Sequence, residues 1–208
     1  MTALNILRCR INLVWKDKVP VVTELGLPIT ATQTFVECPR DLDVLMVPGG
    51  MLGSVACMND PEVMTFLADR GSRAKWVTSI CTGGLTIAAA GLLKSYDANA
   101  TWTISHLLPL MGARHVDKRV VIDRNRMTCG GVTAGIDLGL TLAAKLRGED
   151  AAKRVQLIME YAPEPPFQSG TPAQAPQIAA AIREATPWMQ SQARGAAEAA
   201  GKRLGISL

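Results

Sequence analysis

Residues 75–85 read Lys75-Trp76-Val77-Thr78-Ser79-Ile80-Cys81-Thr82-Gly83-Gly84-Leu85, and this stretch decides the fold. Its first half is a short apolar and β-branched run, which is typical of a buried strand. Beyond the two glycines, residues 85–93 are apolar and Ala-rich without proline, which predicts a buried helix. Cys81 therefore stands at a strand-to-helix turn, the geometry of a nucleophile elbow with cysteine in place of serine.

A cysteine at such a turn is placed for chemistry. The N-terminus of the following helix directs free N–H groups at the thiol and favours its ionised form. Gly83 and Gly84 leave room for other groups to approach closely. The alternative is an inert core residue, because free cysteines are among the most buried side chains. This stretch alone does not separate the two interpretations.

The composition indicates one large cytoplasmic domain. The chain has 208 residues, of which 48% are hydrophobic and 19% charged, so a substantial core can form. A net charge of +4 without a basic cluster argues against nucleic-acid binding, and no apolar run is long enough to span a membrane. Five cysteines without Cys-x-x-Cys spacing predict free thiols and argue against a structural zinc site. We expect no metal or cofactor.

Strands alternate with helices along the chain. Expected strands include Leu42–Val47, closed by Pro48-Gly49-Gly50, a short one over Ala100–Thr103, and two that turn at Asp123–Asn125. This order predicts an α/β fold: a three-layer α/β/α, doubly wound, mostly parallel sheet of flavodoxin-like type. We expect residues 1–162 to form this domain. Residues 163–208, a Pro-rich segment and a C-terminal helix with a break at Pro187, should pack on it.

Ligands of such sheets bind at the carboxyl ends of the strands. Both Pro48-Gly49-Gly50 and the Cys81 turn belong at that edge by this interpretation. The backbone N–H groups of Gly50 and Thr82 are then candidates for an oxyanion-type pocket beside the Cys81 sulfur. An ordinary tight turn is the alternative for the two glycines.

Several stretches carry a family resemblance: Val47-Pro48-Gly49-Gly50, Ser79-Ile80-Cys81-Thr82-Gly83, Ala90-Gly91-Leu92-Leu93, residues 131–137 and residues 160–167. Together they resemble the PfpI-type branch of the class I glutamine-amidotransferase-like superfamily. Within that branch they are most similar to the bacterial isocyanide hydratases. The resemblance covers nearly the whole chain in order.

The resemblance implies a cofactor-free hydration of an isocyanide, R–N≡C, to an N-substituted formamide. Cys81 would attack the terminal carbon as a thiolate and form a covalent thioimidate. Thr82 would hold or polarise the reacting groups, with Gly50 and Gly130 as further substrate-binding candidates. The resemblance also implies a homodimer with its active site near the interface.

Two departures from the family pattern stand out. Family members carry a strand and a catalytic acid before the segment that matches residues 1–7, and Thr101 stands where relatives commonly carry His. His106 lies nearby, but we interpret it as a surface or capping residue. The alternatives are therefore a catalytically impaired member, a redox or glyoxalase-like Cys protein, and the ligand domain of an AraC-type regulator. The last would need a C-terminal DNA-binding region longer than residues 177–208.

Overall fold

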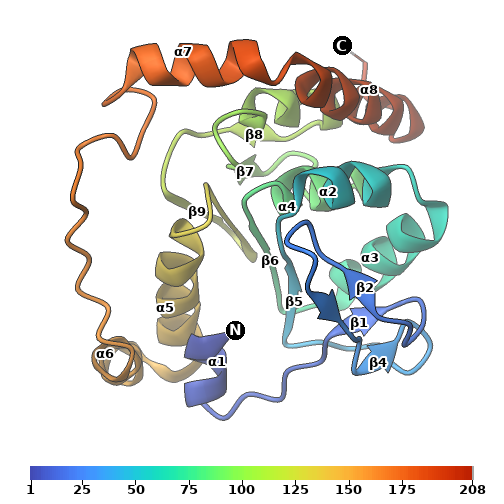
Figure 1. The fold of residues 1–208 in the computed structure, drawn as a ribbon. Helices are drawn as coiled ribbons and strands as arrows, with labels where there is room; N and C mark the ends of the chain where they lie inside the picture. The colour runs from blue at the N-terminus through green and yellow to red at the C-terminus, as the bar shows by residue number, and fades with distance from the viewer. Residues whose placement is uncertain (208) are drawn as a thin grey trace.

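A mixed four-stranded sheet lies at the centre of the computed structural model, which describes residues 1–207 (Figure 1). The strands lie in the order β5 (Val44–Val47), β6 (Trp76–Ile80), β10 (Arg126–Cys129) and β9 (Val120–Asp123). β5, β6 and β10 are parallel, and β9 runs antiparallel to β10. The mostly parallel sheet confirms the predicted fold class. Within residues 1–207, β5 pairs only with β6 and is an edge strand.

Helices cover both faces of this sheet (Figure 1). One face carries the helices α2 (Met51–Met58), α3 (Pro61–Arg73), α4 (Gly83–Ala89) and α8 (Pro187–Arg203), together with the 3₁₀ helix η1 (Ser105–Met111). The other face carries α5 (Ala134–Arg147), which packs against α1 (Thr2–Ile6) and α6 (Glu149–Ile158). Since both faces are covered, three of the five residues of the central strand β6 are buried, namely Val77, Thr78 and Ser79.

Three strand pairs lie outside the central sheet. β1 (Val14–Trp15) pairs in parallel with β4 (Gln33–Thr34), β2 (Val21–Val22) forms a hairpin with β3 (Pro28–Ile29), and β7 (Asp97–Ala98) pairs with β8 (Arg114–His115). The expected strand over Ala100–Thr103 is wrong. That segment turns instead, because the N–H groups of Ile104 and Ser105 both donate to the Thr101 carbonyl.

The C-terminal segment contributes to the larger core. A long extended stretch leads to α7 (Pro176–Ala185), and Pro187 then begins α8, so the predicted break is confirmed. In α8, Ala193, Ala197 and Ala200 are fully buried within the core cluster that also holds Leu85 and Leu108. Small side chains let α8 lie close to α2 and η1. In the described chain, no helix is long and apolar enough to cross a membrane.

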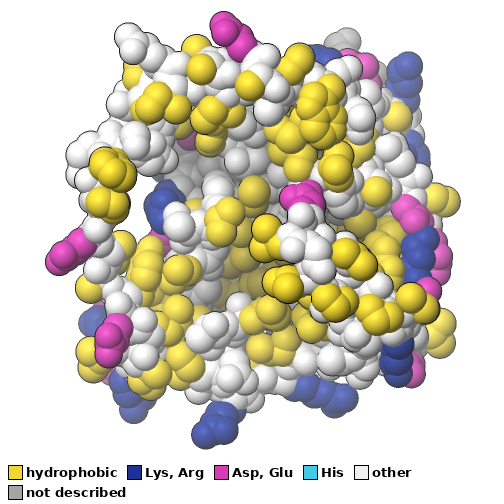
Figure 2. Space-filling view, in the orientation of Figure 1, with side chains coloured by type: hydrophobic (Ala, Val, Ile, Leu, Met, Phe, Trp, Pro, Cys, Tyr) yellow, Lys and Arg dark blue, Asp and Glu magenta, His cyan; other side chains and the backbone are white. Residues whose placement is uncertain are grey.

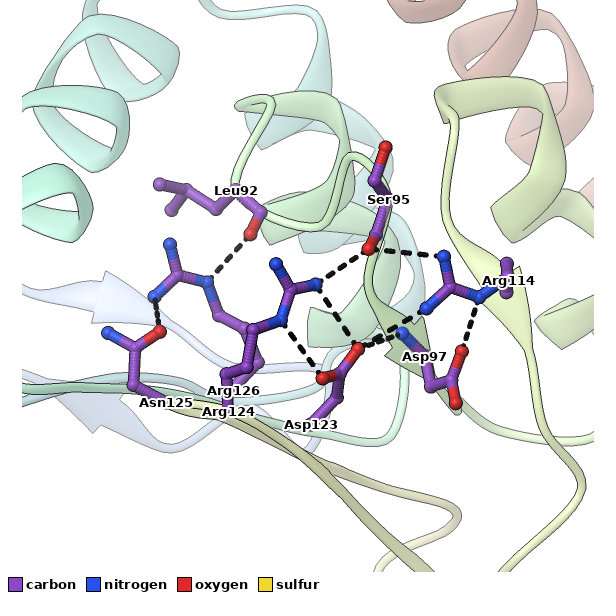
Figure 3. A network of polar contacts seen from close by, with 8 residues as sticks. All are labelled: Leu92, Ser95, Asp97, Arg114, Asp123, Arg124, Asn125 and Arg126. Carbon is purple, nitrogen blue, oxygen red and sulfur yellow. Dashed lines mark hydrogen bonds and ion pairs between the residues drawn. The ribbon is translucent and has the colours of Figure 1, made fainter.

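A hydrogen-bond network that includes several arginines lies at the end of the sheet where β10 begins (Figure 3). Asp123 accepts hydrogen bonds from the Asp97 N–H (2.8 Å) and from Arg124, and Arg124 also donates to the Ser95 carbonyl (2.6 Å). Arg126 is buried and donates to the Leu92 carbonyl (2.7 Å), and its pKa is lowered by burial. The network ties the β9–β10 turn to the chain after α4. The Cys81 turn lies at the opposite end of the sheet, where the parallel strands β5, β6 and β10 end.

Candidate active site

Cys81 occupies a strained turn between β6 and α4. Its φ of 58° lies in the left-handed region, which non-glycine residues seldom adopt. The neighbouring strand and loop hold this conformation: the Cys81 N–H donates to the Gly130 carbonyl (2.8 Å), and the Cys81 carbonyl accepts from the Thr101 N–H (3.3 Å). The structure therefore shows the predicted strand-to-helix turn at Cys81, with the backbone conformation of an elbow. Strain of about 1–3 kcal/mol persists only where the surroundings impose it.

Gly49 and Gly83 allow the backbone of the loop after β5 to lie in direct contact with the Cys81 turn. A Cβ atom on Gly49 would stand 2.8 Å from the Cys81 Cβ and 3.3 Å from its Sγ. A Cβ on Gly83 would stand 2.4 Å from the Val47 carbonyl oxygen. The 2.8 Å and 2.4 Å distances are shorter than real Cβ contacts allow, so these two positions require glycine. The loop that follows β5 thereby forms a wall directly beside the thiol.

Thr82 lies at the centre of a buried polar cluster. Its Oγ1 accepts a hydrogen bond from the Gly50 N–H (2.9 Å) and lies 2.8 Å from the Ser54 Oγ. Thr82 is 2% exposed and Ser54 is 7% exposed. Within residues 1–207, no protein acceptor is recorded for the Thr82 backbone N–H. The same holds for the Gly83 N–H, so within residues 1–207 the elbow carries two backbone donors without a recorded acceptor, and that of Thr82 directly follows the thiol-bearing residue.

The four site residues predicted from the sequence, Cys81, Thr82, Gly50 and Gly130, lie together here. The backbone N–H groups of Gly50 and Gly130, however, already donate hydrogen bonds within the protein. The Gly50 N–H is used by Thr82 Oγ1, and the Gly130 N–H donates to the Arg119 carbonyl (3.1 Å). Gly130 contacts Cys81 through its carbonyl oxygen. Sequence reasoning missed Ser54, because α2 was not predicted and a serine inside a helix gives no signal of its own.

The other thiols have different environments. Burial raises the pKa of the Cys129 thiol to about 12, although this side chain lies next to the Cys81 backbone. Burial, with a contribution from Asp60, also raises the pKa of Cys57. All five cysteines are free. Cys129 is therefore a protonated core thiol, whereas Cys81 is only partly buried at the end of its strand.

Two carboxylates of the chain, Glu24 and Asp137, are hydrogen-bonded to groups other than Cys81 and Thr82. Glu24, at the tip of the β2–β3 hairpin, accepts from the Leu52 N–H (3.3 Å). Asp137 accepts from Arg119 and from the Tyr161 hydroxyl (3.0 Å). In the described part of the chain, no carboxylate is hydrogen-bonded to Cys81 or Thr82, and no group of three His, Cys, Asp or Glu side chains forms a metal-type cluster.

His106 lies on η1, and no hydrogen bond joins it to Cys81 or Thr82 within residues 1–207. Burial, followed by the charges of Arg194 and Arg183, lowers the pKa of its imidazole. Arg183, in α7, lies over the Trp102 ring at 5.0 Å. Two surface clefts, of ≈ 490 Å³ beside Phe66 and ≈ 600 Å³ beside Leu157, also lie apart from Cys81. The candidate site therefore consists of Cys81, Thr82 and the surrounding backbone.

Cys81 stands in a strained elbow at the carboxyl edge of parallel strands whose sheet is covered by helices on both faces. This arrangement is that of the class I glutamine-amidotransferase-like α/β proteins. The chain belongs to one family of that class, the DJ-1/PfpI family, whose sequence profile matches residues 1–145.

Relatives agree with this assignment. The isonitrile hydratase of Pseudomonas putida is 46% identical over 195 residues, which are 93% of this chain and 85% of that protein. The crystal structure of a THiJ/PfpI family protein from Pseudomonas syringae superposes with a TM-score of 0.90 at 41% identity and covers 94% of this chain and 83% of its own. The HTH-type transcriptional regulator GbdR of Pseudomonas aeruginosa is 29% identical over 143 residues, and the match covers only 37% of that protein.

Proposed function

We propose that this protein is an isocyanide hydratase-like enzyme, which adds water to R–N≡C to give the formamide R–NH–CHO. The similarity to a hydratase of isonitriles, another word for isocyanides, supports this choice because it extends over nearly the whole chain. The observation that carries the proposal is the strained Cys81 elbow with the Gly49 backbone against its sulfur. The match to a regulator covers a minor part of that protein and is not favoured.

The chemistry divides into two steps. A lone pair of the Cys81 thiolate forms a bond to the terminal isocyanide carbon, and the carbon then takes up a proton to give the thioimidate R–N=CH–S–Cys81. Water next adds to the same carbon, the nitrogen is protonated, and the C–S bond breaks to release the formamide and the thiolate. The sum is R–N≡C + H₂O → R–NH–CHO, so the reaction needs no oxidant or reductant.

The backbone supplies the polar groups for these steps. The Thr82 N–H has no protein acceptor within residues 1–207 and serves as the donor to developing negative charge on the substrate. Gly50 and Gly130 take part indirectly. Gly50 fixes the Thr82 hydroxyl and Gly130 fixes the Cys81 backbone, each through one hydrogen bond.

A second copy of the chain is the partner expected for this enzyme. The β2–β3 hairpin exposes apolar side chains, including Val22 (68% exposed), Leu25 (85%) and Leu27 (61%). Figure 2 shows hydrophobic side chains gathered over this hairpin and a hollow between it and α7. Apolar patches of this kind mark interaction surfaces. Light scattering at micromolar concentration should give the mass of a dimer, and the mass of a monomer would refute this part.

Turnover with an aromatic isocyanide tests the proposed activity. We expect the wild-type protein to produce the N-aryl formamide and Cys81→Ala to produce none, with both proteins folded by circular dichroism. Cys9→Ala is the matched control, because it removes another partly buried thiol that lies far from the elbow in the sequence. Formamide production by Cys81→Ala at the wild-type rate would contradict the proposed nucleophile.

A further inference from the structure

The Thr82 hydroxyl oxygen lies within hydrogen-bond distance of two groups that can donate to it, the Gly50 N–H and the Ser54 hydroxyl. A hydroxyl carries one hydrogen and two lone pairs. The Gly50 N–H occupies one lone pair of Thr82 Oγ1, and the Ser54 Oγ lies at hydrogen-bond distance from the same atom. Ser54 comes from α2, so the elbow and this helix are joined through a single buried oxygen.

Either hydroxyl can donate in the Ser54–Thr82 pair, and the two directions leave a different hydrogen without a protein acceptor. If Thr82 donated to Ser54, the Ser54 hydrogen would need another acceptor in the interior. Within residues 1–207, Thr82 is the one partner recorded for Ser54 Oγ. A buried hydrogen without an acceptor costs roughly 1–3 kcal/mol. If Ser54 donates instead, both lone pairs of Thr82 Oγ1 are filled, and the hydrogen without a protein acceptor is that of Thr82. This direction places the unpaired hydrogen beside the reactive thiol, where the sulfur or a bound substrate can accept it, and not on Ser54, for which no other acceptor is recorded within residues 1–207.

That unpaired hydrogen lies beside the reactive thiol. The point where a Gly49 Cβ would stand is 3.3 Å from Cys81 Sγ and 3.3 Å from Thr82 Oγ1. Both atoms therefore border the same small space. When both lone pairs of Thr82 Oγ1 accept hydrogen bonds, the hydroxyl can only donate. A substrate carbon bound to Cys81 would gain a lone pair at this place and could accept the Thr82 hydrogen.

We propose that Ser54 is a positioning residue, which holds Thr82 as the proton donor to the carbon that Cys81 attacks. This inference rests on the proposed hydration. As the S–C bond forms, the carbon lone pair takes the Thr82 hydrogen and leaves the charge on Oγ1. The Gly50 N–H and the Ser54 O–H both point at that oxygen and stabilise it, as donors do in an oxyanion hole. The water that adds in the second step returns a proton to Thr82.

The test compares two reactions of the same thiol. Hydration of an isocyanide needs a proton on carbon, whereas alkylation of Cys81 by iodoacetamide needs only the thiolate. We expect Ser54→Ala to lower kcat about tenfold to hundredfold, the range for loss of one such donor, with KM little changed. Alkylation of Cys81 should stay within about twofold of wild type, and Ser54→Thr, which keeps the hydroxyl, should restore kcat.

Ser79 offers a matched control. It lies in β6, it is fully buried, and its Oγ has no hydrogen-bond partner within residues 1–207. Ser79→Ala therefore removes a buried hydroxyl two residues from Cys81 and should leave kcat unchanged. Equal loss of kcat and of alkylation in Ser54→Ala would indicate a general disturbance of the elbow and overturn the inference.

A double-mutant cycle gives a result that does not depend on one variant. Because Ser54 acts through Thr82, Ser54→Ala should have no further effect on kcat in a Thr82→Val background. Additive losses would overturn the inference while wild-type hydration would still support the proposed function. If the wild-type protein hydrates no isocyanide while Cys81 is alkylated normally, the proposed function fails and the inference fails with it.

Discussion

Gly201 of α8 packs directly on the carbonyl group of Leu110 in η1. A Cβ atom on Gly201 would stand 2.2 Å from the Leu110 oxygen, a distance that the rigid backbone cannot relieve locally. Gly201→Ala should therefore lower the free energy of unfolding by roughly 1–3 kcal/mol, the range for an overpacked interior. Thermal and urea denaturation measure this loss.

Gly195 is the matched control for that prediction. It lies in the same helix, is exposed, and has nothing within 4 Å of its would-be Cβ. Gly195→Ala should raise stability by roughly 0.5–1 kcal/mol, because alanine favours the helix. If Gly201→Ala is as stable as Gly195→Ala, then α8 does not pack on η1, and residues 163–208 do not belong to the same folded unit.

The five thiols should react with iodoacetamide in a defined order. Cys81 should be alkylated first at pH 8, because it is partly exposed at a helix start. Cys129 should react only after unfolding. With a pKa of about 12, roughly one Cys129 molecule in 10⁴ is ionised at that pH, and the side chain is fully buried. Peptide mapping over time gives the order, and faster labelling of Cys57 or Cys9 than of Cys81 would refute the elbow assignment.

Gly49 should be intolerant of a side chain. The added methyl group of Gly49→Ala would displace the Cys81 side chain, so alkylation of Cys81 and isocyanide turnover should fall by roughly 10²-fold, the effect of a displacement of about 1 Å. Gly53→Ala, in α2, meets nothing within 4 Å and should leave both rates unchanged. Wild-type rates in Gly49→Ala would show that the loop does not lie against the thiol.

Asp69 should stabilise the protein in a defined pH range. Hydrogen bonds from Arg73, and then from Arg70, lower its pKa to about 2 from the ordinary 3.8. A lowered folded-state pKa means that the stabilisation is complete above the unfolded value and disappears as the pH falls through the folded one. Asp69→Asn should therefore unfold at lower urea than wild type at pH 7, and the gap should close between about pH 4 and pH 2.

Glu164→Gln, at an exposed carboxylate, should track wild type over the whole range. A constant gap between Asp69→Asn and wild type from pH 7 to pH 2 would show that the charge of Asp69 is not the cause.

Much of the fold was predictable because local signals agreed with the final packing. An Asp-Pro pair is a typical helix start, and here Asp60 caps α3 by accepting from the Glu62 and Val63 N–H groups while Pro61 begins the helix. The turn at Asp123–Asn125 joins β9 to β10, and Pro187 separates α7 from α8. The Cys81 elbow was found for the same reason. A strand, small residues and a helix in this order leave few other conformations.

The polar cluster behind the elbow was not predictable. α2 begins at Met51 with a glycine N-cap that makes no side-chain hydrogen bond, and Gly53 interrupts its first turn, so local sequence gives no helix signal there. Tertiary contact with α4 and α8 stabilises this helix instead. Ser54 reaches Thr82 only because α2 forms. Ser54 and Thr82 are 28 residues apart in the sequence, so no local pattern predicts the 2.8 Å contact between their hydroxyl oxygens.

Mass spectrometry of a quenched reaction shows whether Cys81 forms a bond to the isocyanide carbon. Wild-type protein mixed with an excess of an aromatic isocyanide and quenched in acid within a second should carry one added substrate mass, located on the peptide that contains Cys81. Cys81→Ala should carry none under the same conditions. Formamide release by wild type without any adduct on Cys81, or an adduct on another residue that turns over at the steady-state rate, would contradict covalent catalysis by Cys81.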